Sequence, residues 1–186
     1  MNVYDFDKTI YDGDSTVDFI AWCVKKKPVL IAKLFPGVLA FGGYLLKQCE
    51  KTQFKEKFYR FLSGIPDIDL WAEAFWELHQ TGIKDWYLCQ QKEDDVIISA
   101  SPEFLLRPIC KRLGIVHLLA SRVDKDTGMY LGQNCHGEEK VRRFRKAFGD
   151  AEIDAFYSDS LSDAPMANLA ASAYLVDGNL LIPWEE

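Results

Sequence analysis

The sequence predicts an α/β fold with a mainly parallel sheet and an inserted helical region. Two observations predict it. Short apolar runs that end in polar residues alternate with helical patterns, and the long stretch between the first two runs shows no strand-like alternation. Such alternation is typical of parallel sheets covered by helices. Ligands of these sheets bind beyond the carboxyl ends of the strands, so the residues that follow each strand are the candidate functional residues.

Four runs are expected to form the sheet. Each is apolar or β-branched and is followed by small or acidic residues, as in a buried strand that ends at a loop. Helical patterns separate the later runs, and one of these helices should stop at Gly149, since glycine is common just after a helix. The predicted strands are 3–6, 95–99, 153–157 and 173–176, and the predicted helices are 102–113, 138–148 and 164–171.

Residues 13–91 are predicted to form a helical cap inserted after the first strand, because prolines and glycines divide an aromatic-rich stretch into short helices. The catalytic core would then comprise residues 1–12 and 92–186. A short hairpin is expected within residues 121–133, around Asp126-Thr127-Gly128.

The length, net charge and cysteine content limit the classes of function that fit the sequence. The length of 186 residues suits one core of ordinary size with a small subdomain. The net charge of -6 argues against broad nucleic-acid binding, and we expect no nucleic-acid partner. Five cysteines without a Cys-x-x-Cys pair, and an N-terminus without a basic and apolar leader, indicate a reducing compartment. We therefore expect a cytoplasmic protein.

Asp5 and Asp7 are two residues apart at the carboxyl end of the first strand, so their side chains would share one face if the strand stayed regular through the motif. Two carboxylates this close repel each other. A divalent cation would hold one ionised, while the other could keep a raised pKa and act as an acid. This pair suits a nucleophile beside a proton donor. The alternative is a polar strand end with a turn-forming aspartate.

Ser99 ends the second strand, and Ser101 is followed by Pro102 and Glu103, a typical helix start. The N-terminus of that helix would favour an anion such as phosphate in the cleft. For Ser101 we favour capping over ligand contact. The Ser99 hydroxyl is better placed to donate to an oxyanion.

Asp159 and Asp163 follow the third strand. Carboxylates from several loops at one sheet edge favour a hard cation such as Mg²⁺. Asp163 could also cap the helix that begins at Ala164. Lys140 would ordinarily be a solvated surface lysine, but over the same cleft it would balance carboxylate and phosphate charge.

These residues occur in the order and context of four motifs, and the sequence thereby resembles the haloacid dehalogenase-like phosphatases. It is most similar to their phosphoserine phosphatase-like branch, whose helical cap follows the first motif. The resemblance implies a Rossmann-like core and a Mg²⁺-dependent phosphomonoester hydrolase. The residues that carry it are Asp5-Phe6-Asp7-Lys8-Thr9, Ser99, Lys140, and Asp159 with Asp163.

The resemblance also implies residue roles. Asp5 would be the nucleophile that forms an aspartyl-phosphate, and Asp7 would be the general acid and base. Asp7 argues against a dehalogenase, since displacing halide needs no protonated leaving group. A non-catalytic phosphate- or metal-binding module is the alternative, although it would be expected to lose such residues. Ser99, Ala100 and Lys140 would bind the phosphoryl group, and Asp5, the Asp7 carbonyl, Asp159 and Asp163 would hold Mg²⁺.

Residues 25–57 hold eight lysines against two glutamates, and their apolar run 29–46 has Lys33 as its one charge. A basic apolar segment suits peripheral contact with an anionic membrane. We nevertheless expect ordinary cap helices whose apolar faces pack on each other, with membrane contact as the alternative, and Pro36 and the glycines disfavour a membrane span. The segment and the element 135–141 are similar to membrane-associated phosphatidylglycerophosphate phosphatases. That similarity implies a lipid phosphate as the alternative to a small soluble phosphomonoester.

Overall fold

The sheet of the predicted α/β fold is present in the computed structural model, which describes residues 1–45 and 51–184. Over these residues it has six strands in the order β3-β2-β1-β4-β5-β6. Neighbouring strands are parallel except β5 and β6, which are antiparallel. The strands are β1 (Asn2–Tyr4), β2 (Val96–Pro102), β3 (His117–Ser121), β4 (Ile153–Ser158), β5 (Ala170–Asp177) and β6 (Leu180–Pro183).

The chain reverses its direction of travel across the sheet at β1. It runs from β1 through β2 to β3 on one side, and then returns to place β4 and β5 on the other. The point at which the strand order reverses leaves a crevice beyond the carboxyl ends of the strands. The backbone N–H of Asp5 still donates to the Tyr157 carbonyl, 2.9 Å away. The first predicted motif therefore begins at this crevice.

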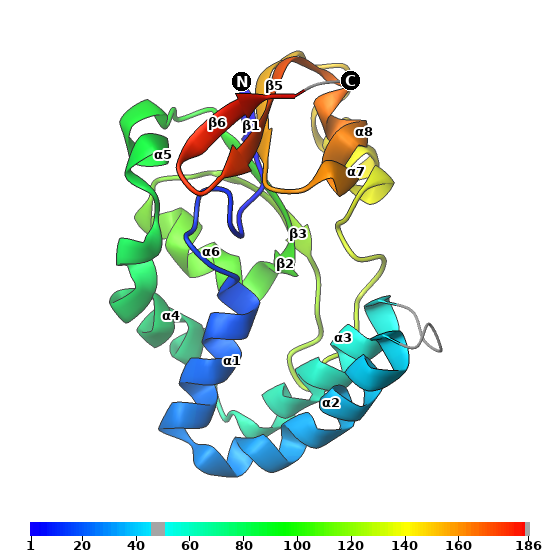
Figure 1. Cartoon of the computed structure of the whole chain (residues 1–186). Helices are drawn as coiled ribbons and strands as arrows, with labels where there is room; N and C mark the ends of the chain where they lie inside the picture. Colours follow the sequence, from blue (N-terminus) through cyan, green and yellow to red (C-terminus); the bar gives the residue numbers. More distant parts are fainter. Residues whose placement is uncertain (46–50, 185–186) are drawn as a thin grey trace.

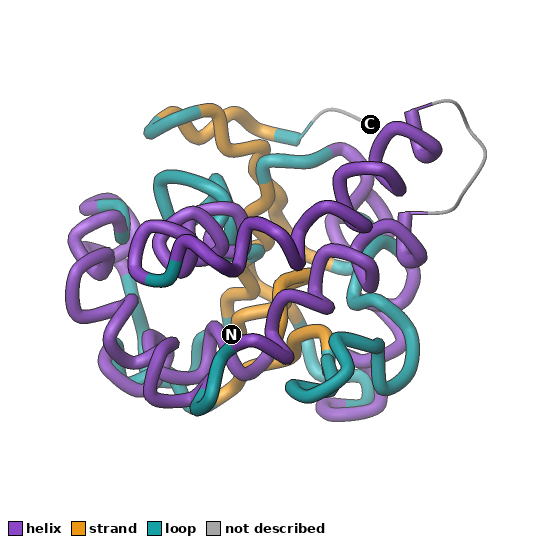
Figure 2. The backbone as a smooth tube through the Cα atoms, turned by 90° about the horizontal axis from the view of Figure 1, so that it is seen from below, coloured by secondary structure: helices purple, strands orange, loops and turns teal. Residues whose placement is uncertain are grey.

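The helices lie on both sides of the strands (Figure 2). In Figure 1, α2 and α3 lie at the end of the molecule opposite β5 and β6, and α1 reaches from the strands toward them. Between β1 and β2 the described helices are α1 (Ser15–Lys26), α2 (Ile31–Leu45), α3 (Lys51–Tyr59), α4 (Ile68–His79) and α5 (Asp85–Gln90), with the 3-10 turns η1 (Pro28–Leu30), η2 (Arg60–Gly64) and η3 (Gln80–Gly82). Later come α6 (Glu103–Arg112), α7 (Glu138–Phe148), η4 (Leu161–Asp163) and α8 (Ala164–Ala167).

Several predicted boundaries shift. The helix predicted at 164–171 ends at Ala167, because Ala170 already pairs with Ile153 of β4. Tertiary pairing has overridden the local helical pattern. The predicted sheet also lacked β3, which has several half-buried positions, and β6, which is mostly exposed. In contrast, α7 has the predicted range, with Gly149 as its C-cap.

Two local predictions have different outcomes. The hairpin expected within 121–133 is present as an antiparallel bridge between Val123 and Tyr130. Pro36, expected to divide two helices, lies inside α2. There Gly37 packs so closely on α3 that an added Cβ would lie 2.8 Å from Phe58. This packing of α2 on α3 helps to offset the hydrogen bond that a proline removes from a helix.

The helical region shares a core with one face of the sheet. Phe19, Phe75 and Trp76 are almost fully buried in the same cluster as Tyr4 and other sheet residues. The Trp76 indole N–H donates to the Leu105 carbonyl at 2.6 Å. Burial of large aromatic side chains contributes about 1.5 to 3 kcal/mol each. This packing holds α1 and α4 against the sheet and α6.

Candidate active site

A cavity of about 450 Å³ opens at the carboxyl ends of β1, β2 and β4, with α1 and α3 across from them. The structure places every sequence-predicted site residue around it. Asp5 and Asp7 lie beyond the end of β1 rather than on a regular strand as predicted, yet both line the cavity. The predicted residues in its lining are Asp5, Asp7, Ser99, Ala100, Lys140, Asp159 and Asp163.

Lys140 bridges two carboxylates at the bottom of this cavity. Its Nζ lies 2.9 Å from Asp5 Oδ1 and 2.6 Å from Asp163 Oδ2. The residue is only 1% exposed, so it is not a solvated surface lysine. Burial alone would lower the pKa of Lys140, but Asp5 and Asp163 raise it above its ordinary value. Lys140 therefore stays an ammonium ion beside Asp5.

Asp163 does not cap the helix that follows it. The structure shows no side-chain capping bond at this helix start. Instead, Asp163 Oδ2 accepts from Lys140 and from the Ser158 hydroxyl, at 2.6 and 2.8 Å. The capping alternative is wrong because a buried ammonium ion attracts the carboxylate more strongly than an exposed backbone N–H.

Asp7 has a different set of partners from Asp5. The backbone N–H of Ser15, the first residue of α1, donates to Asp7 Oδ1 at 2.7 Å. The Ser101 hydroxyl donates to Asp7 Oδ2. Burial and, to a smaller extent, the charge of Asp14 raise the pKa of Asp7 to about 6, although both hydrogen bonds oppose this rise. The carboxyl group is thus held in place and close to protonation near neutral pH.

The expectation that Ser101 caps the next helix is wrong. Strand β2 continues through Pro102, which is itself the N-cap and makes no side-chain capping bond. Ser101 instead contacts Asp7, and its hydroxyl also lies 3.1 Å from that of Thr16. Ser101 therefore fixes Asp7 relative to β2 and α1. The buried Ser99 hydroxyl accepts from the Ser101 N–H at 3.1 Å and keeps its own proton for donation.

The loop after β4 is tied to the first motif. The backbone N–H of Asp159 donates to the Thr9 hydroxyl at 3.0 Å, and Thr9 is fully buried. Burial also raises the pKa of the Asp159 carboxyl. Burial raises the pKa of the Asp5 carboxyl, the adjacent Lys140 ammonium ion opposes this rise, and the charge of Asp163 adds to it. Acidic groups from both loops thus share one poorly hydrated site.

Comparison with known proteins shows the family of the chain. The family model of the haloacid dehalogenase-like hydrolases matches residues 3–168. The chain belongs to this family. It is 29% identical over 183 residues to protein CicA of Caulobacter vibrioides, covering 90% of this chain and 81% of that protein. It is 22% identical over 216 residues to histidinol-phosphatase of Neisseria meningitidis, covering 95% and 90%.

Solved structures agree with the fold of this hydrolase. A protein of unknown function from Bordetella pertussis Tohama I superposes with a TM-score of 0.69 at 21% identity, over 94% of this chain and 88% of that one. A phosphoserine phosphohydrolase-like protein from Francisella tularensis has a TM-score of 0.56 at 15% identity, over 94% and 87%. The predicted family and its phosphoserine phosphatase-like fold are therefore confirmed.

The donor chemistry of this hydrolase fits a hard divalent cation. Asp5, Asp159 and Asp163 line the cavity with one buried lysine among them, which leaves an excess of negative charge. Asp163 Oδ1 is buried without a hydrogen-bond partner. Oxygen ligands of this kind suit Mg²⁺. Within residues 1–45 and 51–184 no three acidic, thiol or imidazole groups form a ready-made cluster, so the fit rests on donor chemistry.

The sequence analysis did not find Lys84, whose side chain binds the backbone of the first motif. Its buried Nζ donates to the Lys8 carbonyl at 2.6 Å and to the Gly178 carbonyl at 2.5 Å. Lys8 has a φ of 57°, a left-handed conformation that is costly for a residue other than glycine. No local pattern marks Lys84, because its partners are 76 and 94 residues away.

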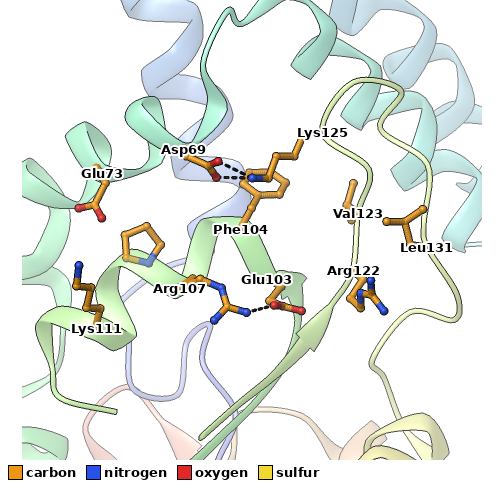
Figure 3. Close-up of a pocket in the computed structure, with 11 residues that line it drawn as sticks. Asp69, Glu73, Glu103, Phe104, Arg107, Lys111, Arg122, Val123, Lys125 and Leu131 are labelled. Atoms are coloured by element: carbon orange, nitrogen blue, oxygen red, sulfur yellow. Dashed lines mark hydrogen bonds and ion pairs between the residues drawn. The ribbon is translucent and has the colours of Figure 1, made fainter. Parts of the chain in front are cut away.

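A second cavity of about 390 Å³ lies between α4, α6 and the hairpin (Figure 3). Lys125 pairs with Asp69 at 2.6 Å, and Arg107 pairs with Glu103, so much of its charge is neutralised locally. None of the motif residues lines this cavity. We therefore assign the first cavity as the candidate active site.

Proposed function

We propose that this hydrolase is a Mg²⁺-dependent phosphomonoesterase with Asp5 as the nucleophile and Asp7 as the general acid and base. The observation that carries the proposal is the contrast between these carboxylates. Asp5 faces the Lys140 ammonium, whereas Asp7 lies against neutral donors from Ser15 and Ser101. Environments that differ in this way let one carboxylate react as an anion while its neighbour carries a proton.

In the first step, an Asp5 oxygen attacks phosphorus and forms an aspartyl-phosphate as the bond to the ester oxygen breaks. Asp7 gives its proton to the departing alkoxide. In the second step, Asp7 takes a proton from water, and that water attacks phosphorus. The acyl-phosphate bond breaks, inorganic phosphate leaves and the Asp5 carboxylate is restored.

Charge stabilisation would come from several groups around the cavity. Ser99, Ala100 and Lys140 would contact the phosphoryl oxygens, with Lys140 as a fixed cation beside the nucleophile. Asp5, the Asp7 carbonyl, Asp159 and Asp163 would hold Mg²⁺. The bound ion would supply charge neutralisation for the transferring phosphoryl group. Placing these groups in advance is the main catalytic requirement of phosphoryl transfer.

The helical residues 13–91 would act as the cap that selects the leaving group. Val17 and Ile20 of α1 and Phe58 of α3 give this side of the cavity an apolar lining. The lining supports a phosphomonoester whose alcohol has an apolar part. Both a small soluble ester and a lipid phosphate meet this requirement. A cytoplasmic location stays a prediction.

A phosphate-release panel with Mg²⁺ tests the proposal on sugar phosphates, phosphoserine, nucleotides and detergent-dispersed lipid phosphates. We expect release from at least one class by the native chain and none by Asp5→Asn. Asp150→Asn, at an exposed position outside the lining of the cavity, is the control and should retain activity. Full activity in Asp5→Asn, or no release from any class, would overturn the proposal. The second result would favour the non-catalytic binding module.

A further inference from the structure

The outer face of η1 and α2 carries four large apolar side chains that point into solvent. Val29, Ile31, Phe35 and Leu39 are between 62% and 67% exposed. We call these four residues the outer stripe. Ile31, Phe35 and Leu39 follow one another at intervals of four, so they lie along one face of α2. Neighbouring exposed apolar side chains of this size are uncommon on monomeric proteins and mark interaction surfaces.

The opposite face of the same segment makes the packing contacts. Leu30 is 1% exposed, and Leu34 packs in part against the main core. Gly37 lies against Phe58 of α3. The expectation that the apolar residues of 29–46 pack within the cap is therefore wrong for the outer stripe. Residues 46–50 of the basic segment lie outside the described residues.

Charge is distributed unevenly between this part of the chain and the rest. Residues 25–60 hold nine basic and two acidic residues, a net charge of +7. The remaining chain holds 13 basic and 26 acidic residues, a net charge of -13. The outer stripe thus lies within the strongly basic part of an acidic protein. An anionic surface would attract this part and repel the remainder.

The length and hydropathy of the described helices suit contact with the surface of a lipid bilayer. Across residues 1–45 and 51–184 no helix has the apolar length needed to cross a bilayer. A helix with one apolar face and nearby lysines instead lies in the plane of the lipid headgroups. Juxtaposed lysines then add attraction to anionic lipids. A second copy of this chain is a poor partner, because it would bring another basic segment to the same face.

We propose that the outer stripe docks this hydrolase on an anionic lipid surface, with the exposed Lys25, Lys26 and Lys57 near the headgroups. The inference goes beyond the proposed catalysis, because docking needs neither Asp5 nor substrate. It would place the chain at a membrane whether its phosphomonoester is soluble or a lipid.

Cosedimentation with vesicles of equal parts phosphatidylglycerol and phosphatidylcholine tests docking. We expect the native chain and Asp5→Asn to bind equally, and neither to bind vesicles of phosphatidylcholine alone. The double variant Phe35→Ser with Leu39→Ser should bind at least about tenfold more weakly. The control Val116→Ser with Leu180→Ser alters side chains that are 72% and 66% exposed elsewhere, and should bind normally. Use of Asp5→Asn separates a failure of docking from a failure of the proposed catalysis.

Charge is tested by Lys25→Gln with Lys57→Gln, two exposed lysines. Each substitution should weaken binding to the anionic vesicles about fivefold. Unchanged thermal melting and unchanged hydrolysis of a soluble substrate would show that every surface variant is folded. Absence of binding by the native chain, or normal binding by the stripe variant, would overturn the proposal. So would a stripe variant that turns a dimer into a monomer, because the partner would then be a second copy.

Discussion

Lys140 lies 2.9 Å from Asp5, although 135 residues separate them in the chain. The contact joins the start of α7 to the end of β1 inside a buried site. A lysine held there would neutralise charge beside the proposed nucleophile without waiting for solvent to reorganise. The same lysine neutralises Asp163, so structure and chemistry depend on one ammonium group.

Lys140→Met should damage stability and activity together. It leaves Asp5 and Asp163 buried without their cation, which costs about 3 to 5 kcal/mol of unfolding free energy. Phosphate release should fall about 100- to 1000-fold. Urea unfolding and a release assay measure the two effects. Adding Asp163→Asn should recover part of the stability but no activity. Equal stability of the single variant and the native chain would contradict the buried ion pair.

Ser101→Ala should act through Asp7. Loss of the hydroxyl donor raises the pKa of Asp7, because that hydrogen bond favours the ionised form. The limb of the pH–rate profile set by Asp7 should move to higher pH, and kcat should fall about tenfold with little change in KM. Ser162→Ala removes another hydroxyl from the same cavity and should leave that limb in place. An unmoved limb in Ser101→Ala would remove Ser101 from this role.

Mg²⁺ should stabilise the folded chain. At a concentration of 100 times its dissociation constant, an ion that binds only the native state adds about 2.7 kcal/mol. For a chain of this length, Tm should rise by roughly 5 to 10 °C, and EDTA should reverse the rise and stop turnover. Asp159→Asn should lose most of the rise, while the control Asp150→Asn should keep it. An identical rise in Asp159→Asn would place the ion elsewhere.

Asp95 should make stability depend on pH. It is fully buried, Oδ2 accepts from the Lys92 N–H at 2.8 Å, and Oδ1 has no partner. Burial raises its pKa above the ordinary value. The folded state therefore binds this proton more tightly than the unfolded state, and stability falls as pH rises through the folded pKa.

Asp95→Asn should remove this dependence. Its unfolding free energy relative to the native chain should increase as pH rises above about 4, the ordinary pKa of an aspartate carboxyl. Denaturant melts at several pH values measure the difference. Asp94→Asn, at the neighbouring exposed position, should show no such trend. A gain that shrinks as pH rises would have the wrong sign and contradict the buried carboxylate.

Local chemistry was enough to predict much of the fold and the members of the candidate site. Asp5, Ser99 and Asp159 could be found because each follows an apolar strand, and parallel strands bring their carboxyl ends to one edge. Gly149 marked the end of α7 because glycine suits a helix C-cap. The partners of Ser101 and Asp163 could not be predicted, because local capping patterns fit both residues equally well.

The sequence by itself determined the alternation of four strands with helices, the motif residues and the basic character of residues 25–57, since these follow from residue type and spacing. Only the tertiary structure decided that Lys84 donates to the Lys8 carbonyl and that the Ser101 hydroxyl donates to Asp7. It also decided that the outer stripe faces solvent. The physical reason is that burial and hydrogen-bond partners depend on segments far apart in the chain. An apolar helix face has the same sequence whether it packs inward or outward, and here the packing of α2 on α3 leaves that face uncovered.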